Sequence, residues 1–151
     1  MFTDLLRRLT EPSSSPLPDA DARIALAALL VRVARSDDRY AAEEIRRIDR
    51  LLATRYRLDP VEAAKLRATA EALEREAPDT VRFTRAIKDA VPHEDRLSVI
   101  EALWDVVLAD GEREDHEMAL LRLVAPMLGI SDQDSAIARR RVDAARRLNP
   151  D

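Results

Sequence analysis

The chain has 151 residues, of which 46% are hydrophobic and 36% charged, and its formal net charge is −4. This length is that of one ordinary domain, and the negative charge disfavours a nucleic-acid partner, since such domains usually carry a basic excess. The absence of cysteine excludes disulfides, thiolate metal sites and a cysteine nucleophile. Only two glycines and few aromatic residues are present, which indicates an all-α protein.

The first 18 residues differ in composition from the rest of the chain. An amphipathic segment, Phe2 to Leu9, precedes the stretch TEPSSSPLPDA, whose prolines and serines predict a linker. The start MFTDLLRRLT lacks the basic region and apolar core of a signal peptide, and no apolar run approaches the roughly 20 residues that cross a bilayer. We therefore expect a segment and linker over residues 1–18, a helical domain over residues 19–151, and a cytoplasmic location.

Apolar residues at helical spacing predict four helices in the first part of the domain. One face of the first helix carries Leu26, Leu29, Leu30 and Val33. Asp59, Pro60 and Glu62 are typical of a helix start, because an aspartate caps, proline fits the first position and the glutamate completes a capping box. The predicted helices span residues 19–35, 41–55, 60–76 and 80–90.

The second part of the domain predicts three more helices. The strongest apolar stripe lies within residues 93–109 and consists of Leu97, Ile100, Leu103, Trp104 and Val107. We expect Trp104 to lie in the core and to bind no ligand. A helix over residues 114–128 follows, and Gly129 is suited to cap its end. The last helix is predicted to start at Ser131 with Asp134, and it carries Ile137, Val142, Ala145 and Leu148.

An internal repeat relates the two parts at an offset of 73 residues. Both parts read as helix, acidic turn, helix. The aligned pairs are Leu30 with Leu103, Val33 with Val106, Asp37 with Asp110, Glu44 with Glu117, Ile48 with Leu121, and Leu51 with Val124. Apolar matches arise easily between amphipathic helices, whereas an aspartate before the turn and a glutamate seven residues later are more specific.

The stretches ARSDDRYAAEE and HEDRLSVIEALWDVVLADGEREDHEMALLRLVAPMLGIS, and the repeat that relates them, resemble the TerB-like family over residues 22–134. This family contains the tellurite-resistance TerB proteins and their relatives, including a module of some membrane-anchored DnaJ-type co-chaperones. The resemblance implies a bundle of about seven helices in a soluble bacterial protein linked to tellurite or envelope stress. It also implies acidic clusters that hold divalent cations, carried here by Asp37 and Glu44, and by Asp110 and Glu117. Asp38 stands where the second turn has a glycine, and few acids follow it.

The acidic turn in LADGEREDHEMALL has two interpretations, and the sequence leaves both open. Hard cations such as Ca²⁺ and Mg²⁺ take oxygen ligands, so Asp110 and Glu117, with Glu112 and Glu114 as additional ligands and Asp38 at the first turn, are chemically suitable. The order of residues is not that of an EF-hand loop. A helix start also favours acids, so Glu112, Glu114 and Asp115 are equally suited to capping alone. Asp110 also follows a helix C-terminus. The negative end of the helix dipole repels the Asp110 carboxylate, and a bound cation would relieve this repulsion.

No other constellation in the sequence carries specific chemistry. His93 and His116 have no partner at the spacing of a helix-borne zinc site, and no nucleophile or cofactor motif accompanies the acids, so we expect no enzymatic activity. The arginines of ARRRVDAARRL suit an acidic protein partner or peripheral contact with anionic lipid, but cations also suit the last turn of a helix, which favours a solvated helix face.

The sequence thus supports a non-enzymatic, stress-linked helical module whose two acidic turns bind a divalent cation. The alternative is a protein-interaction adapter whose acidic turns are purely structural.

Overall fold

The computed structural model describes residues 19–36, 40–77, 80–109 and 115–148, and these ranges contain seven helices and no strand. The helices are α2 (Asp19–Ala34), α3 (Ala42–Tyr56), α4 (Pro60–Glu76), α5 (Val81–Ala90), α6 (His93–Val107), α7 (Asp115–Met127) and α8 (Asp132–Leu148). The predicted all-α fold class is confirmed, and the predicted helix bounds agree within two residues. The proposed segment and linker at residues 1–18 lie outside the described residues. None of the described helices has the length and hydrophobicity of a transmembrane segment.

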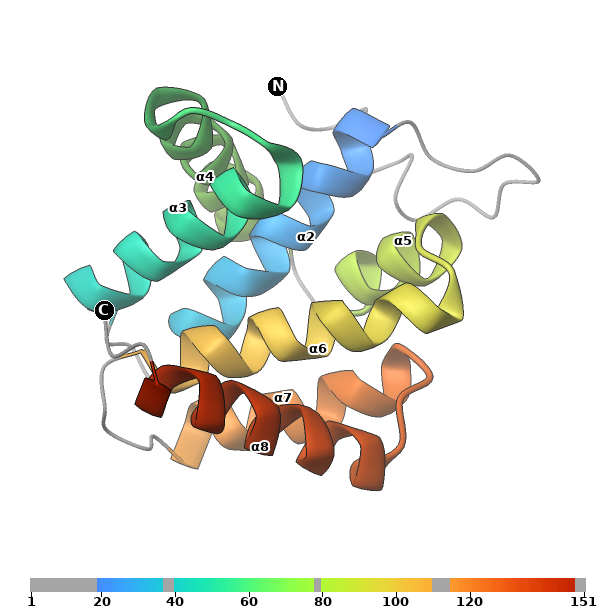
Figure 1. Ribbon diagram of the computed structural model, residues 1–151. Helices are drawn as coiled ribbons and strands as arrows, with labels where there is room; N and C mark the ends of the chain where they lie inside the picture. The colour runs from blue at the N-terminus through green and yellow to red at the C-terminus, as the bar shows by residue number, and fades with distance from the viewer. Residues whose placement is uncertain (1–18, 37–39, 78–79, 110–114, 149–151) are drawn as a thin grey trace.

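Helix α2 forms the centre of the bundle. It packs against α3, α4, α5, α6 and α7, and Figure 1 shows it between the α3–α4 pair and α5. Residues 25–31 are all buried, and seven consecutive residues cover the whole circumference of a helix. The apolar spacing predicted one inward face, which was too narrow, because the alanines between the leucines are buried as well. A helix that is apolar all round belongs to the core.

The predicted helix caps are confirmed. At the start of α4, the Glu62 amide donates to Asp59 Oδ1 at 2.8 Å and the Asp59 amide donates to Glu62 Oε1 at 3.1 Å. At the start of α8, the Asp134 amide donates to the Ser131 hydroxyl at 3.1 Å. Gly129 adopts a φ of 76° after α7, a left-handed conformation that glycine adopts without steric cost. These local signals set where the helices begin and end.

The repeat is visible in the fold and extends further than the sequence alignment. Helices α2, α3 and α4 correspond to α6, α7 and α8, with α5 between the two sets, and in each set the first helix packs closely on the third. Arg57 after α3 has a φ of 54°, matching the left-handed Gly129 after α7. The next residues also match, since the Leu58 amide donates to Ala53 O at 3.0 Å and the Ile130 amide to Ala125 O at 2.9 Å.

The apolar residues noted in the last helix are not those that it buries. In α8 the buried residues are Ser135 and Ala138. Ile137 is exposed, and Leu148 is 82% exposed. Small side chains face α6 because Trp104 lies there, buried as expected, with its Nε1 donating to the Ser135 hydroxyl at 3.1 Å. A larger residue at position 135 would lose this hydrogen bond and displace the indole.

Arginine side chains occupy several helix C-termini, where backbone carbonyls have no partner within the helix. Arg32 of α2 donates to two carbonyls at the end of α4, and Arg146 of α8 donates to two at the end of α6. Arg96 of α6 donates to Lys88 O and Val91 O at the end of α5 and to Leu128 O after α7. A guanidinium carries five donors, so one arginine can join two or three chain segments.

Candidate functional site

Glu44 is the one residue of the first predicted cluster whose side chain the structure describes. It occupies the third position of α3 and is 1% exposed. Its Oε1 accepts a hydrogen bond from the Ala41 amide at 3.2 Å. Burying a carboxylate is costly unless hydrogen bonds, a charge partner or a cation compensates it. Asp37 and Asp38, the other acids of this turn, lie outside the described residues.

The second cluster lies mostly outside the described residues. Asp110, Glu112 and Glu114 belong to that part of the chain, and Glu117 lies in α7, although its side chain is not described. Glu117 occupies the third position of α7, as Glu44 does in α3. The repeat therefore places its two glutamates at equivalent helical positions, each directly after an acidic turn.

The described residues alone do not form a metal centre. No group of three histidines or carboxylates that could hold a metal ion occurs within the ranges that the structure covers. A cation site at either turn therefore depends on the acids of residues 37–39 or 110–114. The predictions for Asp37, Asp38, Asp110, Glu112 and Glu114 remain predictions.

Tyr40 connects the end of the first turn to α4. Burial, followed by the nearby carboxylate of Glu71, raises the pKa of the Tyr40 hydroxyl, which therefore remains protonated at physiological pH. Glu71 lies 3.1 Å from Arg67, whose Nε donates to Asp49 Oδ1 at 2.5 Å. Asp49 of α3 and Glu71 of α4 are thus paired with arginine, which leaves Glu44 and the acids of residues 37–39 as the candidate cation ligands.

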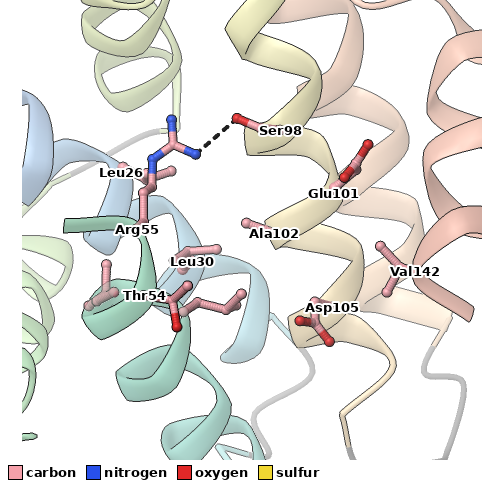
Figure 2. A pocket seen from close by; sticks show the side chains of 11 residues that line it. Leu26, Leu30, Thr54, Arg55, Ser98, Glu101, Ala102, Asp105 and Val142 are labelled. Carbon is pink, nitrogen blue, oxygen red and sulfur yellow. Dashed lines mark hydrogen bonds between the residues drawn. The ribbon is translucent and has the colours of Figure 1, made fainter. Parts of the chain in front are cut away.

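A groove that the sequence analysis did not predict lies between α3, α6 and α8, with α2 beneath it (Figure 2). The groove has a volume of about 310 Å³. The apolar lining consists of Leu26, Leu30, Leu51, Leu52, Ala102 and Val142. At one end Arg55 reaches from α3 to α6, where its Nη1 donates to the Ser98 hydroxyl at 2.9 Å, as the dashed line in Figure 2 marks.

The other end of the groove is charged. Asp105 Oδ1 accepts a hydrogen bond from Arg146 Nη1 at 2.9 Å and lies 3.7 Å from Arg47 Nε. A second hollow, of about 450 Å³, is lined by these residues together with Glu101 and Arg141. Glu101 and Arg141 lie 3.7 Å apart. Three arginines therefore surround two carboxylates at this end. Arg141 and Arg146 belong to the arginine-rich stretch, and Arg146 is paired rather than solvated.

Comparison with known protein families matches residues 23–140 to the family described as Tellurite resistance protein TerB. The match begins within α2 and ends within α8, so it includes both halves of the repeat and both acidic turns. No curated protein and no solved structure matches the chain.

Proposed function

Because the chain belongs to the TerB family, we propose that it is a non-enzymatic, stress-linked module that binds a divalent cation, Ca²⁺ or Mg²⁺, at its two acidic turns. The observation that carries this proposal is the burial of Glu44 directly after the first turn, at the helical position that Glu117 occupies after the second. We also propose the cytoplasmic location that the sequence predicts.

The physical reason for a cation at these turns is the arrangement of the helix ends. Asp37 and Asp110 each follow a helix C-terminus, where the partial charge of the backbone is negative. A divalent cation would neutralise the aspartate together with the glutamate at the start of the next helix. Ca²⁺ takes six to eight oxygen ligands, and the second turn offers more carboxylates than the first. We therefore expect the second turn to bind more tightly.

A second candidate function, the protein-interaction adapter, is favoured by the surface of α7. Leu123 is 61% exposed, and Met127, one helical turn later, is also exposed. Apolar residues one turn apart on a helix can contact a partner. In this interpretation the acidic residues only cap α3 and α7.

Calorimetric titration of the metal-free chain with CaCl₂ or MgCl₂ tests the proposal. We expect saturable heat with two classes of site, of which the weaker disappears in Asp37→Asn. A titration with NaCl at matched ionic strength is the control. If the divalent salts give no heat beyond this control, the acids are caps and the adapter function replaces cation binding.

A further inference from the structure

We propose that the groove between α3, α6 and α8 binds a small anionic amphiphile, a free molecule with a medium-length apolar chain and one carboxylate or phosphate head. The chain lies over Leu26 and Leu30, and the head lies between Arg47 and Arg146. This site goes beyond the acidic turns and does not require a cation at either of them.

The groove has the size of a ligand pocket, and much of its lining is apolar. Its volume of about 310 Å³ lies at the lower end of the roughly 300–1,000 Å³ that small-molecule pockets span. The leucines of α2 form a buried floor, while Leu51, Ala102 and Val142 are half-buried walls. A chain in this hollow would remove the exposed parts of these walls from water, which is the main driving force for binding an apolar group.

The residues that line the charged end of the groove carry a net positive charge. Arg47, Arg141 and Arg146 line it with Asp105 and Glu101, three positive charges against two negative, a net charge of +1. Asp105 is shared between Arg47 and Arg146. Burial lowers the pKa of Arg47, and the charges of Arg146 and Arg50 lower it further, against the opposing effect of Asp105. An anionic head placed between Arg47 and Arg146, the two arginines that contact Asp105, would neutralise this positive charge.

The shape of the groove favours a short ligand over the helix of a protein partner. The exposed contact between Arg55 and Ser98 bridges one end, as Figure 2 shows, so a longer chain would have to break this hydrogen bond to continue past it. The two ends of the groove are marked on α3 by Arg47 and Arg55, which are eight residues apart in the helix. At the rise of an α-helix this is a length of about 12 Å. A partner helix is about 10–12 Å wide with its side chains, and would have to separate α3 from α6. A medium-length chain fits without this movement.

Calorimetric titration of the full chain with decanoate tests the site, in buffer with EDTA so that no divalent cation contributes. Decanol, which has the chain without the charge, is titrated in parallel. We expect one molecule of decanoate to bind, and Arg47→Gln to weaken its binding about tenfold, the effect of losing one charge-assisted contact. The affinity for decanol should be unchanged in this variant, and Ala102→Phe, which fills the hollow, should weaken both ligands.

Arg46→Gln is the matched control, because Arg46 lies one residue away on α3, is 67% exposed and pairs with Glu43 outside the groove. It changes the net charge equally and should leave decanoate affinity unchanged. Methyl chemical shifts of the native chain give a second measurement that needs no variant, with decanoate expected to move the signals of Leu26, Leu30 and Val142.

Several results would overturn the proposal. One is the absence of decanoate binding to the native chain, with no shift of the groove methyls. Another is equal weakening by Arg46→Gln and Arg47→Gln, which would indicate attraction by overall charge. Binding to vesicles containing phosphatidylglycerol without binding of free decanoate would instead indicate peripheral membrane contact. Because EDTA is present, none of these results bears on cation binding at the turns.

Discussion

The two halves of the repeat hold their first and third helices together by the same ion pair with the charges exchanged. In the first half Arg32 of α2 pairs with Glu74 of α4, at 3.8 Å. In the second half Asp105 of α6 pairs with Arg146 of α8, at 2.9 Å. Asp105 stands at the position of Arg32 with an offset of 73, and Arg146 at the position of Glu74 with an offset of 72. The geometry is shared, whereas the residues are not.

The backbone explains why either arrangement works. In each half the arginine also donates to carbonyls at the C-terminus of the helix opposite it, Arg32 to Glu74 O and Ala77 O, and Arg146 to Asp105 O and Ala109 O. Carbonyls at a helix C-terminus lack the amide partners of the helix interior, although Glu74 O also accepts from the Ala77 amide at 3.3 Å. In both halves one guanidinium thus lies between the ends of the first and third helices, and either of the two helices can supply it.

The largest expected effect comes from the core residues that the repeat aligns. Leu30 and Leu103 are both buried, and truncating either to alanine should lower the free energy of unfolding by about 3 kcal/mol. Urea denaturation measures the loss, with Leu148→Ala as the exposed control. Both halves share the core around α2, so circular dichroism and Trp104 fluorescence should report one transition. Separate transitions would show that the halves fold independently.

A smaller effect is expected from removing the two arginines. Arg32→Gln should lower the free energy of unfolding by about 2 kcal/mol, and Arg146→Gln by about 1 kcal/mol, because a partly buried carbonyl that loses its donor carries a desolvation penalty. The order follows from the bonds to backbone, 2.7 and 3.0 Å for Arg32 against 3.3 and 3.4 Å for Arg146. Arg147→Gln, at an exposed position, is the control. A loss for Arg147→Gln as large as for the other two would refute the helix-end role.

The smallest expected effect concerns the left-handed residues that end α3 and α7. Gly129→Ala should lower the free energy of unfolding by about 1 kcal/mol, because its φ is positive and the added Cβ would lie 3.3 Å from Arg96 Nη1. Arg57→Gly should raise it by about 0.5 kcal/mol, since the gain from the relaxed backbone is partly offset by the entropy of glycine in the unfolded chain. Thermal melts measure both. Destabilisation by Arg57→Gly would indicate that the arginine side chain contributes more than the backbone strain costs.

The sequence predicted the features of the fold that depend on neighbouring residues. The capping box of Asp59 and Glu62, the cap at Ser131 and the left-handed Gly129 are all local signals, and each helix was located from them and from apolar spacing. Arg57 was not identified as a helix end, because nothing in its residue type marks a positive φ. Its left-handed conformation is seen in the structure, where it matches that of Gly129.

Features that depend on how helices meet were not predictable. The burial of residues 25–31 of α2 on all sides involves five neighbouring helices, and the exposure of Ile137 and Leu148 reflects the face that α8 turns to Trp104. The groove combines residues from Leu26 to Arg146, whose proximity depends on the placement of four helices. For the acidic turns, the helical positions of Glu44 and Glu117 agree with the repeat, while ligation by either cluster is still a prediction.

The most direct test of the central claim is the melting temperature of the native chain with and without Ca²⁺ or Mg²⁺ at matched ionic strength. A cation bound only by the folded state stabilises it by about 2.7 kcal/mol at a hundredfold excess over Kd. Cation binding at the turns predicts a rise that Asp110→Asn with Glu117→Gln largely removes, and that Asp37→Asn with Glu44→Gln removes less. Comparing each variant with itself, with and without cation, separates ligation from lost capping. A native chain whose melting temperature does not change with either cation would contradict the claim.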